Sequence, residues 1–383
     1  MIVSVPRETA PGERRVALTP DVVKRLAGDA VEIRVESGAG SHAGFVDEAY
    51  TAAGATIVGD AGALWGEADV LLTVQRPALG DGADQVSLLH EGAVVVGMLQ
   101  PLTSPALVKA LAGRKVTAMS LDQLPRISRA QSMDTLSSQA TVAGYKAVLL
   151  AATHVDKMFP MLITAAGTIA PAKVLILGAG VAGLQAIATA RRLGAVVEAF
   201  DVRPAVKEQV ESLGAKFVSP AAVEAEGEGG YAKQQTEDQQ QNTLDFLHGR
   251  VPGMDIVITT ALIPGKPAPL LITEAMVKDM RPGAVIVDLA AEMGGNCELT
   301  RADETVVRHG VTVLGPLNIP ASVPFHASQM FAKNLQNFLA EFVKDGSVVL
   351  DFENEVISGT CITHEGRVVH GRTRQAMGEG DAA

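Results

Sequence analysis

A glycine pattern in the middle of the chain restricts the possible folds more than any other feature of the sequence. Gly178, Gly180 and Gly183 follow the apolar run VLIL and open the helix-like segment LQAIATARRL. At such a strand-to-helix junction the first glycine permits a tight turn, the second lets backbone approach a pyrophosphate, and the third lets helix pack on strand. The glycine spacing alone also fits a turn in another α/β protein. Its position between a strand and a helix predicts a dinucleotide site, because a helix N-terminus binds phosphates.

An acidic residue after the next apolar run indicates which dinucleotide binds. Asp201 ends VVEAFD, 18 residues after Gly183. A carboxylate at about this distance bonds the adenosine ribose hydroxyls and disfavours a 2′-phosphate, so NAD(H) is predicted rather than NADP(H). Arg203 slightly weakens the preference for NAD(H) over NADP(H), because an arginine near this position can accept a 2′-phosphate. The candidate NAD contacts in this region are Gly178, Gly180, Val181, Ala182, Gly183, Asp201, Val202 and Arg203.

Apolar runs alternate with helical periodicity on both sides of the glycine junction. IVSV, VEIRVE, DVLLTVQ, AVVVGML and KVTAMSL fill the first 121 residues, and KVLILG, VVEAFD, KFV, DIVITTA, AVIVDLA and VTVLG continue to about residue 315. This alternation predicts an α/β fold with two parallel sheets covered by helices. Helix starts are expected at Thr19-Pro20, Ser104-Pro105 and Thr273-Glu274, where a hydroxyl can cap free N–H groups.

The order of the runs predicts two domains. Residues 328–343 have apolar positions at helical spacing, and we expect this helix to return the chain to the first domain. Residues 1–136 with 328–383 are then the first Rossmann-like domain, and 137–327 the NAD-binding Rossmann domain. The weakly charged segment 158–173 is expected to form a hairpin with Gly167 at its bend. A buried connector is the alternative for this segment.

Composition excludes several classes of protein. The net charge of −11 repels a phosphate backbone, so nucleic acid is not an expected partner. Cys297 and Cys361 are far apart and in no metal-ligand spacing, so we expect neither a disulfide framework nor a metal site. The N-terminus lacks the continuous apolar core of a secretion signal, and the uncharged run 174–190 is short for a membrane span and rich in glycine. A cytoplasmic protein is expected.

Several motifs resemble a known family over nearly the whole chain. PRETAPGERRVALTP, GAGVAGLQAIATARRLGA, TTALIPGKPAPLLIT and DLAAEMGGN are similar to the alanine dehydrogenase and nicotinamide nucleotide transhydrogenase superfamily. The segment 126–134, RISRAQSMD, resembles the loop that marks the NAD(H)-binding component of proton-translocating transhydrogenase. The resemblance implies two Rossmann-like domains with NAD in the cleft at the second one. It also implies a homodimer at the inner face of the plasma membrane, transferring hydride between NADH and NADP+ on a partner subunit while membrane subunits translocate protons.

The resemblance also assigns roles to residues outside the glycine junction. Arg126, Gln131 and Asp134 are expected to hold the nicotinamide end and to act in catalysis, and Ser137 to bond the carboxamide. The alternative is a solvated, capped loop with a surface ion pair between Arg126 and Asp134. By the resemblance, the polar segment 225–246 corresponds to a mobile loop whose tyrosine lies near the adenosine, and an incidental turn residue is the alternative for that tyrosine. The further candidate NAD contacts are Ile127, Ser128, Arg129, Gly230, Tyr231, Ala261 and Leu262.

The chemistry of the first domain favours the transhydrogenase side of this superfamily. An amino-acid dehydrogenase needs a general base and a cationic grip on the substrate carboxylate. Gln75 and Met98 stand where alanine dehydrogenases are expected to carry a lysine and a histidine, and only Arg15 remains of the grip. Hydride transfer between two nicotinamides moves no proton, so positioning and water exclusion suffice. An alanine dehydrogenase-like enzyme with another substrate and a non-enzymatic NAD-sensing module remain the alternatives.

Overall fold

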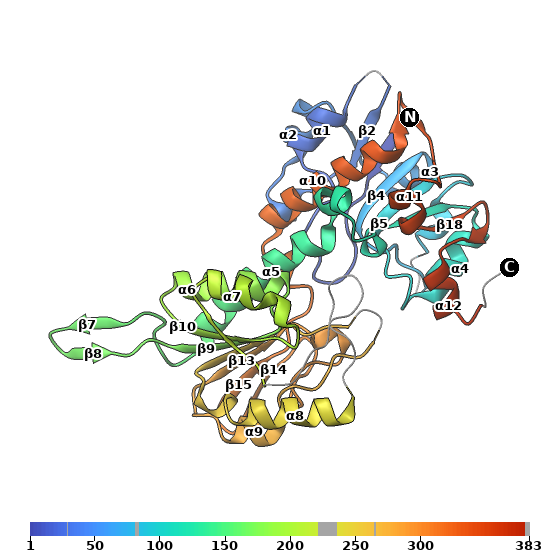
Figure 1. Cartoon of the computed structure of the whole chain (residues 1–383). Helices are drawn as coiled ribbons and strands as arrows, with labels where there is room; N and C mark the ends of the chain where they lie inside the picture. Colours follow the sequence, from blue (N-terminus) through green and yellow to red (C-terminus); the bar gives the residue numbers. More distant parts are fainter. Residues whose placement is uncertain (29, 81–83, 221–235, 264–265, 380–383) are drawn as a thin grey trace. The chain divides into compact units, whose positions relative to one another are not determined.

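The computed structural model describes residues 1–28, 30–80, 84–220, 236–263 and 266–379, which form two compact units (Figure 1). Unit 1 comprises Met1–Gln139 and Pro320–Ala383, and unit 2 comprises Ala140–Ile319. The first division lies three residues after the boundary expected at residue 136, and the second lies eight residues before the one expected at residue 327. Helix α5 (Thr135–His154) carries the chain from unit 1 into unit 2.

Unit 1 contains an eight-stranded sheet in the order β19-β18-β6-β5-β4-β1-β2-β3. The pairings from β6 to β3 are parallel, whereas β18 runs antiparallel to both of its neighbours. Apolar runs without alternation suit these central strands, because helices cover both faces of the sheet. The strands are β1 (Ile2–Val5), β2 (Glu32–Glu36), β3 (Thr56–Val58), β4 (Val70–Gln75), β5 (Val94–Met98), β6 (Thr117–Ser120), β18 (Cys361–His364) and β19 (Arg367–Val368).

Helices form a core on each face of this sheet. One core contains residues of α1 (Pro20–Leu26), α2 (Asp47–Ala52), α10 (Pro324–Phe342) and α11 (Glu355–Thr360). The other contains residues of α3 (Ala61–Gly66) and α4 (Pro105–Gly113). Phe331, Phe338 and Phe342 of α10 are completely buried, so this helix returns the chain to unit 1 through its apolar stripe. The remaining elements of the unit are α12 (Gly371–Ala376) and the pair β16 (Val343–Lys344) and β17 (Ser347–Val348).

Unit 2 contains a seven-stranded sheet in the order β11-β10-β9-β12-β13-β15-β14, in which only β14 is antiparallel to its neighbour. From β9 the chain first builds β10 and β11 on one side, and β12 then lies on the other side. The carboxyl ends of β9 and β12 therefore meet at a topological switch point, where ligands bind in such sheets. The strands are β9 (Lys173–Leu177), β10 (Val196–Phe200), β11 (Lys216–Val218), β12 (Ile256–Thr259), β13 (Val285–Asp288), β14 (Thr305–Arg308) and β15 (Val311–Leu314).

Helices cover both faces of the second sheet as well (Figure 1). One core packs α5, α6 (Val181–Arg192) and α7 (Lys207–Ser212) on the sheet. The other core packs α8 (Glu237–His248) and α9 (Glu274–Lys278). The predicted α/β class with two mostly parallel sheets is confirmed. In the part of the chain that the structure describes, no helix combines the length and the apolar character needed to cross a bilayer.

A two-stranded hairpin projects from the rest of unit 2 (Figure 1). Its strands are β7 (Leu162–Thr164) and β8 (Gly167–Ile169). The predicted hairpin is confirmed, and the alternative of a buried connector is wrong, because Ile163 is 78% exposed and its neighbours are also mostly exposed. The two-residue turn is Ala165-Ala166, with Gly167 directly after it at φ 119°. The bend thus precedes the glycine that we expected to occupy it.

The predicted helix starts are confirmed at Pro20, Pro105 and Glu274, but the capping prediction is only partly right. Thr273 Oγ1 accepts a hydrogen bond from Met276 N at 3.4 Å. Thr19 and Ser104 make no side-chain cap. The Ser104 hydroxyl instead accepts from the Arg76 guanidinium, which draws it away from the helix N-terminus.

Candidate functional site

Two glycines of the turn at the end of β9, Gly178 and Gly183, are needed for the fold itself. Gly178 has φ 100°, a region that glycine adopts without steric cost. A Cβ on Gly183 would lie 1.9 Å from Gly178 O, so α6 can pack on this turn only without a side chain there. Gly180 is different, because a Cβ placed on it meets no atom within 4 Å. The middle glycine therefore faces open space, as a phosphate-binding turn requires.

Helix α6 presents its N-terminus to this space. Gly180 is the N-cap, and no side chain caps the helix there. A helix of 12 residues has a positive dipole end that favours a bound anion. Helix α5 supports the first turn closely, since a Cβ on Gly144 would lie 2.0 Å from Ala182 O. Val181 is exposed at the start of the helix and Ala182 is partly buried. The turn and helix thus fit a pyrophosphate group.

Asp201 lies directly after β10 and binds the glycine turn. Its Oδ2 accepts from Ala179 N at 2.7 Å, which connects the carboxylate to the turn after β9. Its Oδ1 accepts from Arg203 N at 2.9 Å, and the Arg203 guanidinium donates to both oxygens. Val202, between them, packs partly buried against the core below. The structure therefore brings the predicted ribose-binding carboxylate beside the predicted phosphate turn.

The segment after β12 completes the same edge of the sheet. Thr260 Oγ1 donates to Gly178 O at 3.1 Å and so joins this segment to the glycine turn. Asn296 Nδ2 donates to Ala261 O at 2.9 Å, and its Oδ1 accepts from Ala261 N at 3.1 Å. Leu262 is exposed beside Ala261. Ala261 and Leu262, predicted from resemblance alone, therefore lie at the switch point next to the turn.

A buried carboxylate behind Asn296 was missed by the sequence reasoning. Asp288 is fully buried at the end of β13 and accepts from Thr259 Oγ1, Thr300 Oγ1 and three backbone N–H groups. One of these N–H groups is that of Asn296, at 2.7 Å from Asp288 Oδ2. A carboxylate is stable in a buried place when it accepts several hydrogen bonds. The available signal was an aspartate ending the apolar run AVIVD ahead of Gly-Gly-Asn.

The segment 126–134 of unit 1 folds mainly as the 3₁₀ helix η4 (Ser128–Met133). With three residues per turn, residues three apart lie on the same side. Ala130 and Met133 are buried in the core, and Ile127 packs against it. Gln131 and Ser128 are exposed, as is Arg126 just before the helix. The apolar positions thus anchor the segment in the core, and the side chains of Ser128 and Gln131 lie at the surface.

Asp134 and Ser137 have a local role in this structure. Asp134 Oδ1 accepts from Ser137 N at 2.9 Å, and Oδ2 accepts from Ser137 Oγ at 2.6 Å. This is the pattern of an N-cap, and it explains the start of α5 at Thr135. The backbone carbonyl of Ser132 accepts from Asn334 and Asn337 of α10, which also fixes the segment. A contact of Asp134 or Ser137 with a nucleotide stays a prediction.

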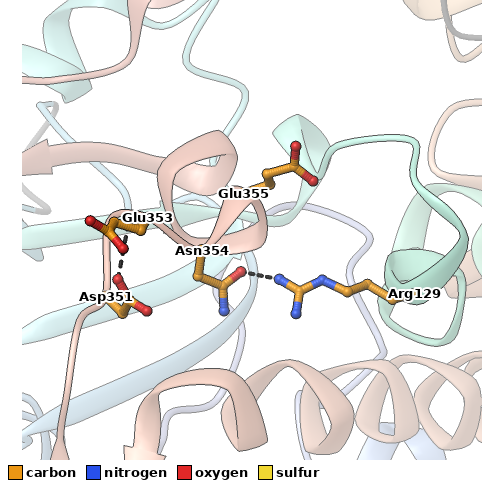
Figure 2. A pocket seen from close by; sticks show the side chains of 5 residues that line it. All are labelled: Arg129, Asp351, Glu353, Asn354 and Glu355. Carbon is orange, nitrogen blue, oxygen red and sulfur yellow. Dashed lines mark hydrogen bonds between the residues drawn. The ribbon is translucent and has the colours of Figure 1, made fainter.

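Arg129 contacts the C-terminal part of unit 1. Its guanidinium donates to Asn354 Oδ1 and lies 3.6 Å from Glu341 Oε2. Arg129 and Asn354 both line a polar pocket of about 500 Å³, and Figure 2 shows the Arg129 guanidinium pointing toward the Asn354 side chain. The other residues that line this pocket are Asp351, Glu353 and Glu355. Arg129 therefore stabilises the turn before α11, and its contact with NAD stays a prediction.

A buried polar cluster in unit 1 surrounds Arg15. Arg15 is 2% exposed and donates through Nε and Nη2 to the Glu13 carboxylate and through Nη1 to Gln139 Oε1. Burial raises the pKa of Glu13, but the bonds and charge of Arg15 outweigh it and lower that pKa to about 2. Gln75 also donates to Glu13, at 2.9 Å, and Gln75 and Met98 are register partners on β4 and β5. Neither residue can act as a base.

Part of the predicted polar loop is helical. Helix α8 starts at Glu237, and Thr236 and Gln239 form a capping box there. The expectation of a loop through residue 246 is therefore wrong for residues 237–246, because this cap and the apolar positions of the helix favour helical structure. Gly230 and Tyr231 lie outside the described residues.

Within the described residues, no group of three or more His, Cys, Asp or Glu side chains is placed to hold a metal ion.

Comparisons with known proteins agree with this geometry. Residues 4–143 match the family described as alanine dehydrogenase/PNT, N-terminal domain, and residues 147–371 match its C-terminal domain. The chain is 53% identical over 376 residues to the first part of the NAD(P) transhydrogenase subunit alpha of Rhodospirillum rubrum, and the match covers 97% of this chain and 98% of that protein.

Solved structures show the same likeness. A transhydrogenase from Sinorhizobium meliloti superposes with a TM-score of 0.84 and 43% identity, over 97% of this chain and 99% of that one. An L-alanine dehydrogenase superposes with a TM-score of 0.79 and 25% identity, over 99% of each chain. The resemblance inferred from the sequence motifs is confirmed. The chain belongs to the alanine dehydrogenase/PNT family, and within it to the transhydrogenase alpha subunits.

Proposed function

We propose that unit 2 binds NAD(H) at the carboxyl edge of its sheet and exchanges hydride with NADP(H) held by a partner subunit. The observation that carries this proposal is the open space at Gly180, the N-cap of α6, next to Ala179, whose N–H donates to Asp201. The relatives named transhydrogenase support the reaction class, since the chain matches one of them over nearly its whole length. NAD(H) supplies the transferable hydride.

We assign the two halves of the nucleotide to residues on opposite sides of the glycine turn. Asp201 follows β10, on one side of β9, where it can bond the adenosine ribose. Ala261 and Leu262 follow β12, on the other side, so we assign them to the nicotinamide half. Arg126, Gln131 and Asp134 of unit 1 are proposed to position the nicotinamide for transfer. Positioning of this kind contributes to rate without any covalent step by the protein.

The cluster around Arg15 argues against an amino-acid dehydrogenase. Its guanidinium is already bonded by Glu13 and Gln139, so a substrate carboxylate would have to displace buried partners. Gln75 and Met98 provide no general base on the neighbouring strands. Hydride transfer between two nicotinamides requires neither group, so this arrangement supports the transhydrogenase reaction.

We also propose how the chain assembles. The projecting hairpin β7–β8 is proposed to take part in a homodimer, because its apolar side chains are exposed on a segment that contributes little to its own unit's core. Further transhydrogenase subunits would provide the NADP(H) site and the coupling of hydride transfer to proton translocation. We place the chain at the inner face of the plasma membrane through these subunits.

A single assay series tests the function. NADH-dependent reduction of an NADP+ analogue is measured with the chain alone and with an added NADP(H)-binding domain. In a third reaction, without the added domain, reduction of NAD+ is measured in the presence of alanine. We expect NADH binding to the chain alone and hydride transfer only with the added domain. Alanine-dependent NAD+ reduction would favour an alanine dehydrogenase-like enzyme. Nucleotide binding without transfer under any condition would favour an NAD-sensing module.

A further inference from the structure

Arg203 is bonded to Asp201 in a way that bears on the choice between NAD(H) and NADP(H). We propose that Asp201 determines this choice twice: its carboxylate is directed at the ribose hydroxyls, and it also sequesters Arg203, which would otherwise bind a 2′-phosphate. The inference rests on the proposed nucleotide site and adds a specificity-determining role for Arg203. The sequence alone did not show whether Arg203 can accept a 2′-phosphate, whereas in the structure its guanidinium is bonded to Asp201.

The geometry shows how completely Arg203 is engaged by the carboxylate. Its backbone N and its Nε both donate to Asp201 Oδ1 at 2.9 Å, and its Nη2 donates to Oδ2 at 2.7 Å. The side chain of Arg203 is only 15% exposed and that of Asp201 is 5% exposed. A guanidinium that donates through two nitrogens to one carboxylate is held in a fixed plane.

The local backbone favours this closed arrangement. Arg203 precedes Pro204, which opens the 3₁₀ helix η5 (Pro204–Val206), and a residue before proline avoids the helical region. Its φ of −97° and ψ of 112° are extended, as expected. In this conformation the N–H and the side chain of Arg203 both bond to the carboxylate two residues earlier. The backbone conformation of the turn after β10 therefore favours the ion pair between Arg203 and Asp201.

Loss of the carboxylate would release the Nε and Nη2 donors of Arg203 that it accepts from. Guanidinium donors that lose a carboxylate favour another anion, and phosphate is a good geometric match for two of these nitrogens. Lys207, close by in the sequence, is exposed and lies 4.0 Å from Glu211. Because Lys207 is unchanged by substitutions at Asp201 and Arg203, it cannot account for a difference between such variants.

The test uses the adenosine half of the nucleotide alone. Binding of 5′-AMP and of adenosine 2′,5′-bisphosphate is measured by calorimetry for the wild type, Asp201→Ala, Arg203→Ala and the double variant. We expect Asp201→Ala to bind the bisphosphate about tenfold more tightly than the wild type, the scale of one hydrogen bond to a charged group. The gain should disappear in the double variant and be absent in Arg203→Ala. It should also shrink as salt is added.

Several outcomes would overturn the inference. Equal bisphosphate affinity of Asp201→Ala and the double variant would show that Arg203 does not bind the phosphate. A gain in Arg203→Ala alone would show that sequestration is not what limits the wild type. If Asp201→Ala fails to fold because Ala179 N loses its acceptor, Asp201→Asn keeps an acceptor oxygen and should give the same gain in smaller measure. Absence of such a gain in that variant would then refute the inference.

The proposed function itself is tested separately in the same experiment. If the wild type binds neither 5′-AMP nor NADH, the nucleotide site is wrongly assigned. If the wild type binds both but no substitution at Asp201 improves bisphosphate binding, the nucleotide site stands and only the role of Arg203 is rejected.

Discussion

The side-chain amide of Asn296 bonds both backbone groups of Ala261. Its Nδ2 donates to the carbonyl at 2.9 Å and its Oδ1 accepts from the N–H at 3.1 Å. The same Nδ2 donates to Pro269 O at 2.8 Å, and the N–H of Asn296 itself donates to buried Asp288. Asn296 thus fixes the segment after β12 to the buried core of the sheet, although it lies 35 residues after Ala261 in the chain.

Replacement of this amide should weaken binding of one half of the nucleotide. Asn296→Ala removes the hydrogen bonds to Ala261 and Pro269, so the segment at the nicotinamide side loses its fixed position. We expect NADH affinity to fall about tenfold, equivalent to about 1.4 kcal/mol, while ADP affinity stays close to that of the wild type. Calorimetric titration of both ligands checks this. A parallel loss of ADP affinity would contradict the assignment of this segment to the nicotinamide half.

The glycine turn allows a matched pair of substitutions. Gly180→Ala places a Cβ where no atom lies within 4 Å, and φ −75° suits alanine, so the protein should fold normally. NADH binding should nevertheless fall by at least about tenfold, because the methyl group takes the space of a phosphate. Gly183→Ala should instead lower the free energy of unfolding by about 1–3 kcal/mol, since its Cβ clashes with Gly178 O. Thermal unfolding and NADH titration of both variants separate the two effects, and unimpaired NADH binding by Gly180→Ala would remove the phosphate from this turn.

These glycines also show what could be predicted from the sequence. Gly178, Gly180, Gly183 and Asp201 were predicted because strand, turn and helix follow one another locally, and local spacing determines such a unit. Asp288 and Asn296 were missed, because their partners Thr259 and Ala261 are brought to them by strand pairing far along the chain. Spacing carries no such information without the sheet order.

The structure shows a local role for Asp134 and Ser137 that the sequence did not indicate. They bond each other as a helix cap, and their expected contact with the nicotinamide stays a prediction. Aspartate is both a common cap and a common ligand-binding residue, so the sequence alone cannot separate the two roles. The segment 158–173 presented the same difficulty, since an apolar run is compatible with a core connector and with an exposed hairpin.

Glu8 should make the stability of the protein depend on pH. Its carboxylate accepts from Val74 N at 2.6 Å and Gln75 N at 3.2 Å, and burial raises its pKa to about 7 despite these bonds. The folded protein then binds more protons at Glu8 than the unfolded one between the ordinary pKa of 4.5 and 7. Its contribution to stability is complete below about pH 4.5 and is lost as the pH rises through about 7.

Glu8→Gln removes this titration and provides the measurement. The free energy of unfolding of the variant, relative to the wild type, should rise by about 1 kcal/mol from pH 4.5 to pH 7.5, a value reduced for the partial exposure of the side chain. Glu208→Gln, at an exposed position, is the control. Urea unfolding at several pH values gives the comparison. A pH-independent difference for Glu8→Gln would exclude titration of Glu8 near neutrality.

The hairpin β7–β8 should determine the oligomeric state. Ile163 is 78% exposed on this hairpin, and Val307 is 64% exposed on the edge strand β14. A charge at a buried subunit interface is costly, so Ile163→Glu should shift the protein from dimer to monomer, whereas Val307→Glu should not. Analytical ultracentrifugation of both variants and the wild type measures this. A wild-type monomer, or a dimer that survives Ile163→Glu, would exclude this hairpin as a necessary contact.

Gln131 offers the sharpest test of the segment before α5. It is exposed on η4, whose other side is anchored in the core by Ala130 and Met133. Gln131→Asn shortens the side chain by one methylene group and keeps the amide, so reach changes while polarity does not. The exposed Ser132 is the neighbouring control, because Ser132→Ala leaves intact the backbone carbonyl that bonds α10.

We expect Gln131→Asn to slow hydride transfer far more than it weakens NADH binding. The glycine turn and Asp201 are unchanged in this variant, so affinity should remain within about threefold of the wild type, less than the contribution of one hydrogen bond. A nicotinamide misplaced by roughly 1 Å can cost about a hundredfold in rate, because positioning acts on the transition state. Single-turnover transfer in the presence of an NADP(H)-binding domain, with calorimetry for NADH, measures both quantities. Transfer at the wild-type rate, with Ser132→Ala equally active, would reduce this segment to a solvated connector that only starts helix α5.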